Sequence, residues 1–257
     1  MVLDNQFQRY VRQISVPEIA ERGQERLLSS HVLVIGCGGL GTAASLYLAG
    51  AGIGRLVIAD QDIVELSNLP RQIAYRQDDV GASKVTALRQ QLLARNDDVS
   101  IRTVKTFLSG AQLKLEVSLA DIVIDCSDNL PTRHAINQAC YETKTNLVSG
   151  AAIGWNGQLT VFGFASQPSA PCYRCLYPFD DLSAPIDCSS SGVVGPVVGM
   201  IGVYSALEAI KIASGRVQSI TPTIKMFDGF NGHWQSLKLQ HDPECRVCAS
   251  GQKEHVS

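Results

Sequence analysis

Residues 31–41 read HVLVIGCGGLG, in which a short β-rich run enters a loop that contains four glycines. The run His31–Ile35 predicts a strand, and Leu40–Ala51 has the pattern of a helix. Gly36, Gly38 and Gly41 have the spacing of a dinucleotide-binding turn, where glycines let the backbone approach a phosphate at the start of a helix. This unit predicts a nucleotide site in an α/β fold.

Asp60 ends the next predicted strand, Leu56–Asp60, and stands 19 positions after Gly41. A carboxylate in that place can bind the hydroxyls of a ribose. The alternative is a glycine turn without a ligand, followed by a carboxylate that only caps a strand. The order of strand, loop and helix favours the nucleotide.

The rest of the chain predicts a Rossmann-like, mostly parallel sheet that antiparallel strands continue. The elements expected as far as residue 150 are helices over Val80–Arg95, Ala111–Leu119 and Thr132–Thr143 and strands over Val99–Val104, Ile122–Cys126 and Asn146–Ser149. After Gly150 the pattern changes to alternating strands over Gln158–Phe164, Thr223–Asp228 and Trp234–Leu239, with an irregular segment, Ala165–Gly192, between them.

A chain of 257 residues can form one substantial core, and we interpret it as a single domain. Residues 1–150 are its expected nucleotide-binding half. Residues 151–248 are the antiparallel half, and residues 249–257 are a tail.

Composition excludes several classes of protein. A net charge of −2 with 18% charged residues argues against a basic nucleic-acid surface. Met1–Tyr10 lacks the pattern of a signal peptide, which indicates the cytoplasm. The apolar run Val193–Leu207 is shorter than a membrane span and contains Pro196, so we expect no membrane segment. Instead we predict a helix over Pro196–Ser214, apolar nearly all round, that is buried in the core or against a partner chain.

Cations, carboxylates and amides cluster after the second strand and at the end of the fourth. They are Asp62, Asn68, Arg71, Gln72 and Lys84, followed by Asp125 and Asp128. Transfer at a phosphorus atom needs fixed cations and Mg²⁺, because charge develops on the phosphate oxygens. Hydride transfer from NAD does not need them. An NAD-dependent oxidoreductase, an ATP-binding scaffold without turnover, and simple surface ion pairs or helix caps stay open as alternatives.

Two Cys-x-x-Cys pairs, Cys172/Cys175 and Cys245/Cys248, predict a structural zinc site, because four thiolates complete a tetrahedral shell. Unligated or disulfide-bonded cysteines and a zinc-ribbon nucleic-acid module are the alternatives. Cys188 is different, since it stands alone in a polar segment. Cys37, Cys126 and Cys140 lie in apolar runs and are expected to be small buried residues.

Several motifs together resemble those of the ThiF/MoeB/HesA family, which is itself similar to the adenylation domains of ubiquitin-activating enzymes. The resemblance runs from about Gln6 to Cys248. Its motifs are Arg9-Tyr10-x-Arg12-Gln13, Gly36-x-Gly38-Gly39-Leu40-Gly41, Asp60-x-Asp62, Ser67-Asn68-Leu69-x-Arg71-Gln72, Lys84, Asp125-Cys126-x-Asp128-Asn129, Cys172-Tyr173-Arg174-Cys175 and Cys245-x-x-Cys248.

The resemblance implies an adenylyltransferase. Members of the family use ATP to adenylate the C-terminal glycine carboxylate of a small ubiquitin-like sulfur carrier that ends in Gly-Gly, and they release pyrophosphate. Asp60 would then bind the ribose, and Asp128 would bind Mg²⁺. Asn68, Arg71 and Lys84 would hold the phosphates. The wider expected nucleotide site also includes Gly36, Gly38, Gly39, Gly41, Asp62, Ser67, Gln72 and Asn129.

The resemblance also implies partners. Arg12 corresponds to an arginine that reaches into the neighbouring subunit's site, which implies a homodimer. Cys188 corresponds to a cysteine that can form a sulfur-linked conjugate with the carrier, whereas the simpler reading is a plain loop cysteine. The antiparallel half would dock the carrier. With no sulfurtransferase domain after Cys248, we expect a separate sulfur donor.

Within the family, Gly192–Gly199 and Leu207–Lys211 look more like the thiamine-pathway members, which act on a ThiS-like carrier. The molybdopterin-pathway members, which act on a MoaD-like carrier, are the alternative. Pro70 departs from the family pattern, where glutamine usually precedes the arginine. Proline lacks an N–H donor and fixes φ, so contacts to the phosphates at this position are in question.

Overall fold

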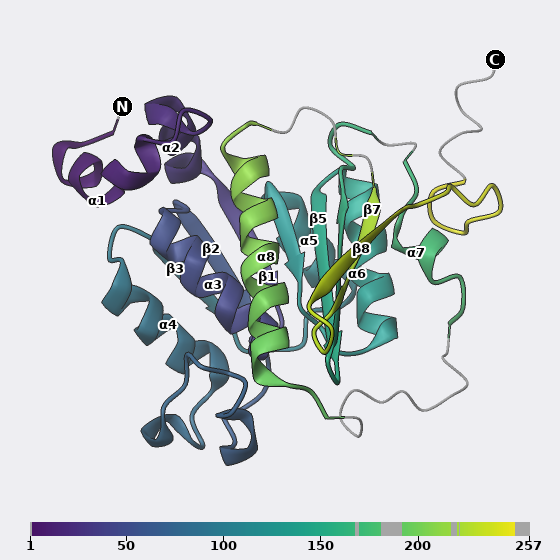
Figure 1. Cartoon of the computed structure of the whole chain (residues 1–257), viewed down its shortest axis with the longest axis horizontal. Helices are drawn as coiled ribbons and strands as arrows, with labels where there is room; N and C mark the ends of the chain where they lie inside the picture. Colours follow the sequence, from purple (N-terminus) through teal and green to yellow (C-terminus); the bar gives the residue numbers. More distant parts are fainter. Residues whose placement is uncertain (1, 168–169, 181–191, 217–219, 221, 250–257) are drawn as a thin grey trace.

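A single eight-stranded sheet runs through the protein (Figure 1). The computed structural model describes residues 2–167, 170–180, 192–216, 220 and 222–249. In the order of the sheet, the strands are β3 (Ser100–Val104), β2 (Arg55–Ala59), β1 (His31–Ile35), β4 (Ile122–Asp125), β5 (Asn146–Ile153), β6 (Asn156–Phe162), β7 (Thr223–Asp228) and β8 (His233–Lys238).

The first five strands in this order are parallel, and the last three continue the sheet antiparallel to their neighbours. This arrangement confirms the Rossmann-like interpretation. The register places Ile35 of β1 beside Ala59 of β2 and Asp125 of β4. The carboxyl ends of these three strands therefore form one edge, where ligands bind in open α/β sheets.

Helices cover both faces of the sheet. The eight α-helices of the described residues are α1 (Asp4–Ile14), α2 (Ala20–Ser29), α3 (Gly39–Ala51), α4 (Lys84–Arg95), α5 (Gly110–Leu119), α6 (Leu130–Thr143), α7 (Tyr173–Leu176) and α8 (Gly195–Ala213). Leu48, Leu88 and Ile201 of α3, α4 and α8 belong to one buried cluster. Val117 and Ile136 of α5 and α6 belong to a second. Burial on both sides explains why β1 and β4 are apolar without alternation.

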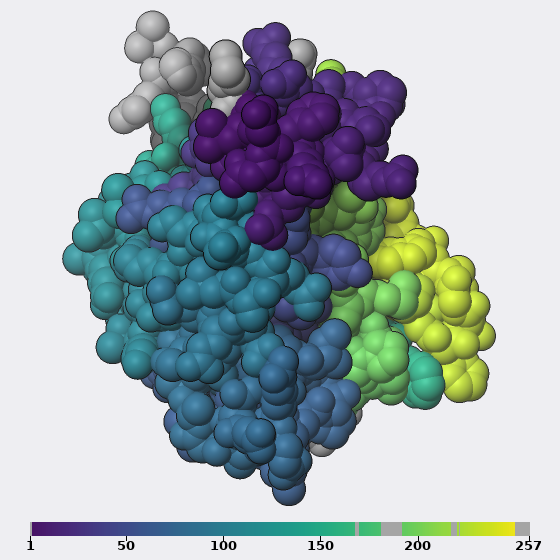
Figure 2. All heavy atoms as spheres, turned by 90° about the vertical axis from the view of Figure 1, so that its left-hand side faces the viewer, coloured from purple at the N-terminus to yellow at the C-terminus, as the bar shows by residue number. Residues whose placement is uncertain are grey.

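The structure corrects several predicted boundaries. The N-terminal helices α1 and α2 were not predicted, and they form a cap above α4 and α8 (purple in Figure 2). The helix expected from Val80 begins only at Lys84, because a short turn (Gln77–Asp79) and Gly81, at φ +91°, precede it. Strand β5 extends to Ile153, four residues past the expected end at Ser149.

The predicted apolar helix is α8, and it is a core helix. By length and composition it would suffice for a membrane span. However, it packs on α3, β5 and β6, and Ile201, Ala206 and Ala209 are fully buried. Its opposite side leaves Met200 43% and Leu207 50% exposed in the single chain (green in Figure 2). The expected burial is thus only partly provided by this chain's own core.

We expect Gly41→Ala to lower the free energy of unfolding by about 1–3 kcal/mol, because a Cβ at Gly41 would lie 1.8 Å from the Gly36 carbonyl oxygen. Gly50→Ala in the same helix is the matched control, since it meets nothing within 4 Å. Gly50→Ala should raise the free energy of unfolding by about 0.5–1 kcal/mol. Chemical denaturation of both variants measures the difference, and equal stability would contradict the tight turn.

Candidate functional site

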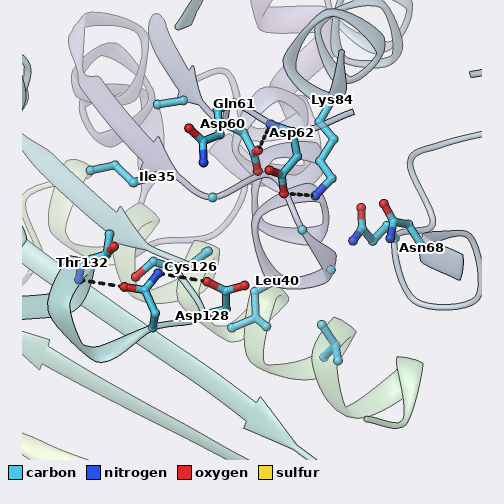
Figure 3. Close-up of a pocket in the computed structure, with 18 of the residues that line it drawn as sticks. Ile35, Leu40, Asp60, Gln61, Asp62, Asn68, Lys84, Cys126, Asp128 and Thr132 are labelled. Carbon is cyan, nitrogen blue, oxygen red and sulfur yellow. Dashed lines mark hydrogen bonds and ion pairs between the residues drawn. The ribbon is translucent and has the colours of Figure 1, made fainter. Parts of the chain in front are cut away.

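A pocket of about 730 Å³ opens at the carboxyl edge of β1, β2 and β4 (Figure 3). This volume is in the range of small-molecule and cofactor sites. The predicted nucleotide-site residues that line it are Gly36, Gly38, Gly39, Asp60, Asp62, Asn68, Arg71, Gln72, Lys84, Asp128 and Asn129. Gly41 and Ser67 do not line the pocket.

The glycine loop exposes the first turn of α3 to the pocket. Gly36 has φ +93°, which an L side chain rarely adopts, and Gly38 precedes the helix without a side-chain cap. A Cβ at Gly39 would lie 2.4 Å from Cγ1 of Val198 and 2.8 Å from the carbonyl oxygen of Arg71. The open N–H groups of this 13-residue helix carry partial positive charge, so the loop is built to receive an anion.

Asp60 is fixed from two directions. Its Oδ2 accepts a hydrogen bond from the Cys37 N–H at 2.7 Å. Its Oδ1 accepts one from the Asp62 N–H at 2.8 Å (Figure 3). A carboxylate offers about four lone-pair sites, so acceptor capacity remains toward the pocket. Asp60 therefore joins the glycine loop to β2 and still has capacity to bind a ligand.

Lys84 and Asp62 form an ion pair of 2.8 Å at the pocket wall (Figure 3). Lys84 is buried and begins α4, and its N–H donates to the carbonyl of Asp62 at 3.0 Å. Asp62 is exposed. The ammonium group is thus held at the pocket by an exposed carboxylate, and an incoming phosphate could replace that partner.

Arg71 is held by a backbone acceptor, because its guanidinium donates to the carbonyl of Ser67 at 2.9 Å. The Ser67 hydroxyl donates to Glu65 at 3.1 Å, so this serine supports the arginine and contributes no side chain to the pocket. Gln72 is buried, and its Oε1 has no hydrogen-bond partner within the described part of the chain. These groups form a polar wall beside the glycine loop.

The aspartates at the end of β4 and just after it have different environments. Asp125 is fully buried and accepts hydrogen bonds from the N–H and hydroxyl of Ser127 and from the hydroxyl of Ser149. Asp128 is exposed at the pocket and accepts from Asn129 at 3.2 Å (Figure 3). Asn129 in turn caps α6 by accepting the Thr132 N–H. Asp128 is therefore the one of these two carboxylates that a cation in the pocket could reach.

Arg133 was missed by sequence reasoning. It is buried, lines the pocket and donates to the carbonyl of Ser127, the carbonyl of Gly150 at 2.9 Å and the hydroxyl of Ser149 at 3.1 Å. The signal available in the sequence was a basic residue one turn into α6, the helix that begins at the carboxyl edge of the sheet after β4. The other missed lining residues include Gln61, Glu65, Thr106, Phe107, Leu108 and Thr132.

The thiols near the pocket are not activated. Burial raises the pKa of the Cys37 thiol well above its usual range, with Asp60 nearby adding to the effect. Burial also raises the pKa of the Cys126 thiol. Cys37 and Cys140 are buried as expected, and Cys126 is partly buried. Since the thiolate is the nucleophile, neither of these two thiols is suited to attack a substrate.

The four predicted metal ligands meet in one cluster. Their Sγ atoms all lie within 4.8 Å of one another, with Cys172 and Cys245 3.6 Å apart and Cys175 and Cys248 3.3 Å apart. Zinc–sulfur bonds of about 2.3 Å in a tetrahedron would separate the sulfurs by about 3.8 Å. Nε2 of His241 lies 3.3 Å from the Cys248 sulfur. The donor set thus fits a closed four-thiolate zinc site.

The remaining predicted site residues are Arg12 and Cys188. Arg12 is exposed on α1 and does not line the pocket of its own chain. Cys188 lies outside the described residues.

Comparison with known proteins places the chain in a family. Residues 10–247 match the family model described as the ThiF family. The chain belongs to the ThiF family. It is 45% identical over 253 residues to "Sulfur carrier protein ThiS adenylyltransferase" of Escherichia coli (strain K12), covering 98% of this chain and 99% of the relative. It is 41% identical over 245 residues to "Molybdopterin-synthase adenylyltransferase" of the same strain, covering 95% and 97%.

A solved structure agrees with the fold. The crystal structure of E. coli MccB with MccA-N7isoASN superimposes with a TM-score of 0.79 at 23% identity, over 93% of this chain and 74% of that one. Because two named adenylyltransferases match the ThiF-family chain over nearly its whole length, the chain is an adenylyltransferase. The NAD-dependent oxidoreductase considered above is therefore set aside.

Proposed function

We propose that the protein uses ATP to adenylate the C-terminal glycine carboxylate of a small ubiquitin-like sulfur carrier. One observation carries the proposal. The open start of α3 shares one pocket with two cations, Arg71 and Lys84, and with the carboxylate of Asp128. A triphosphate suits this combination, because it needs both backbone N–H donors and fixed positive charge.

In the proposed binding mode, the phosphates lie at the glycine loop between Asn68, Arg71 and Lys84. The ribose hydroxyls donate to Asp60, whose orientation is already fixed by the N–H groups of Cys37 and Asp62. Lys84 would exchange its ion pair with Asp62 for the phosphates. Asp128 would hold Mg²⁺, which supplies further charge neutralisation when bound.

The reaction needs no general base, because the attacking carboxylate is already ionised at neutral pH. A carboxylate oxygen forms a bond to the α-phosphorus, and the bond from that phosphorus to the bridging oxygen breaks. The electron pair leaves with pyrophosphate, and the carrier keeps an acyl-adenylate. Arg71 and Lys84 would stabilise the charge that develops on the phosphate oxygens, so catalysis consists of positioning and charge stabilisation.

A ThiS-like carrier, and thus a step in thiamine thiazole biosynthesis, is our preferred assignment. The 45% identity to the ThiS adenylyltransferase, against 41% for the molybdopterin-synthase adenylyltransferase, supports it. A MoaD-like carrier is the alternative. Pro70 does not disturb the neighbouring turn, since the Arg71 N–H still donates to the Asn68 carbonyl at 3.1 Å.

We further propose a cytoplasmic homodimer with composite active sites. The exposed apolar side of α8 supports a partner chain, and Arg12 on the outward side of α1 is free to reach a neighbour's pocket. A separate protein would donate the sulfur, and Cys188 would form a conjugate with the carrier only after adenylation. Zinc held by Cys172, Cys175, Cys245 and Cys248 would have a structural role, since four thiolates leave no open position.

We expect ATP–pyrophosphate exchange that depends on a carrier and is faster with a ThiS-like than with a MoaD-like protein. Arg71→Ala and Asp128→Ala should each lower the exchange rate by about 100-fold or more, because they remove charge stabilisation in the transition state. Arg76→Ala and Asp78→Ala are matched controls, since both residues are exposed and lie outside the pocket. Exchange at the wild-type rate in both pocket variants would refute the site.

Elemental analysis of freshly purified protein should find one zinc per chain. Cys175→Ser and Cys248→Ser should lower the zinc content and the melting temperature, because each removes a thiolate ligand. Cys140→Ala, a buried cysteine outside the cluster, should keep its zinc and is the control. Native protein without zinc would count against the metal site.

Mixing an Arg12→Ala chain with an Asp128→Ala chain should restore ATP–pyrophosphate exchange. Each heterodimer would contain one composite site with both residues intact, so random mixing should recover about a quarter of the wild-type rate. Subunit exchange is verified by native mass spectrometry with a tagged chain. If exchange of subunits occurs without recovery, Arg12 acts within its own chain or has no part in the reaction.

A further inference from the structure

Helix α1 is attached to the carboxyl end of α3. Tyr10, the one buried residue among the described residues of α1, lies against Gly52, which ends α3. Gly52 has φ +82°, and a Cβ there would lie 2.5 Å from Cζ of the tyrosine ring. The Tyr10 hydroxyl accepts a hydrogen bond from Nδ2 of Asn96 at 2.8 Å, and the same nitrogen donates to the carbonyl of Ala49 at 2.7 Å. Ring and hydroxyl together therefore fix Tyr10 at the last turn of α3.

Gln13 and Arg9 complete this attachment. Nε2 of Gln13 donates to the carbonyl of Ala51 at 3.0 Å. Arg9 forms an ion pair of 3.0 Å with Asp97, just after the end of α4. The last carbonyls of a helix have no partners within it, so side chains that bind them cap the helix. Arg9, Tyr10 and Gln13 of one motif thus bind α1 to the ends of two helices.

Arg12 belongs to the same motif but takes no part in these contacts. It follows Tyr10 by two residues, which is about 200° around an α-helix, so it projects from the opposite side of α1. Its side chain is exposed and has no hydrogen bond or ion pair with the described residues. The attachment of α1 therefore leaves the Arg12 guanidinium directed outward.

The length of α3 separates Arg12 from the pocket of its own chain. Helix α3 begins at Gly39, which lines the pocket, and ends at Ala51, where α1 is attached. Its 13 residues correspond to about 20 Å. Figure 1 shows α1 at one end of the molecule and the segment between β2 and α4, which lines the pocket, at the other. An arginine side chain does not span this distance, so any role of Arg12 in a pocket requires a second chain.

We propose that Arg9, Tyr10 and Gln13 are positioning residues, which hold α1 at the end of α3 so that Arg12 enters the pocket of a second copy of this chain. The inference rests on the proposed function, which assigns Arg12 to a composite site. A guanidinium stabilises developing charge best when its position is fixed before the reaction. Loosening the attachment in one chain should therefore slow the reaction in the pocket of the other chain.

Gln13→Ala is the variant that tests this role. It removes one attachment of α1, while the carbonyl of Ala51 keeps the hydrogen bond from Nε2 of Gln24 at 3.0 Å. Gln91→Ala is the matched control. Gln91 is partly buried on α4, and its side chain has no hydrogen bond with the described residues.

The test compares two heterodimers that contain the same substitutions in different arrangements, each purified through two affinity tags, one on each chain. In the first, one chain carries Gln13→Ala and the other carries Asp128→Ala. In the second, one chain carries both substitutions and the other is wild type. The pocket that keeps Asp128 receives Arg12 from a chain with an intact Gln13 in the first heterodimer, and from a Gln13→Ala chain in the second.

Carrier-dependent ATP–pyrophosphate exchange should be about ten-fold or more faster in the first heterodimer than in the second. The same pair built with Gln91→Ala should show equal rates. A general loss of stability would slow both arrangements alike, because their substitutions are the same. Equal rates for the Gln13 pair, or a faster second heterodimer, would therefore refute the positioning role.

A third pair, with Arg12→Ala in place of Gln13→Ala, tests the composite site by itself. If this pair differs in the expected direction and the Gln13 pair does not, the positioning role is refuted and the composite site stands. If the Arg12 pair shows equal rates, or the chains do not form dimers, the composite site of the proposed function fails. The positioning role then fails with it.

Discussion

The shared carboxyl edge of β1, β2 and β4 is the constraint on which the site depends. Parallel pairing sets Ile35, Ala59 and Asp125 side by side, so the three chain segments that leave these strands must converge. The first segment can turn into α3 only because residue 41 is a glycine. No side chain would fit there, since Gly41 lies so close to the Gly36 carbonyl. Asp60 then ties the second segment to the first through the Cys37 N–H. The pocket is a consequence of strand register and a close backbone contact.

Within the pocket, charge is arranged before any ligand arrives. An unpaired buried cation is costly, and Lys84 avoids this cost through its ion pair with Asp62, which remains exposed. Arg71 is held by a neutral carbonyl, so its charge is not neutralised by that contact. Asp125 and Asp128, three residues apart, differ because one is enclosed by hydrogen-bond donors and the other faces the pocket. For these two aspartates, burial separates the structural carboxylate from the one that faces the pocket.

The predictable parts of the molecule are those that local pattern determines. Fully buried strands such as β1 and β4 and the glycine loop were visible in the sequence, and eleven predicted nucleotide-site residues line one pocket. Helices α1 and α2 were missed, since α1 buries only Tyr10 and offers little apolar signal. Arg133 was missed because its partners include carbonyls from distant segments, which no local pattern displays. Ser67 belongs to a recognisable motif, yet its carbonyl rather than its hydroxyl supports the site.

The two halves expected from the sequence both contribute residues to each of the two buried clusters and to the pocket. Strand β5 pairs in parallel with β4 and antiparallel with β6, so the sheet passes between the halves without interruption. Helix α8 returns from the second half to pack on α3, where Val198 lies against Gly39 of the glycine loop. Ala151, Ala152 and Val193 also line the pocket. Among the described lining residues, residues 1–150 therefore supply the polar groups, and the second half completes the wall with apolar residues. The close contact at Gly39 makes the shape of the phosphate loop depend on a helix that follows it by more than 150 residues.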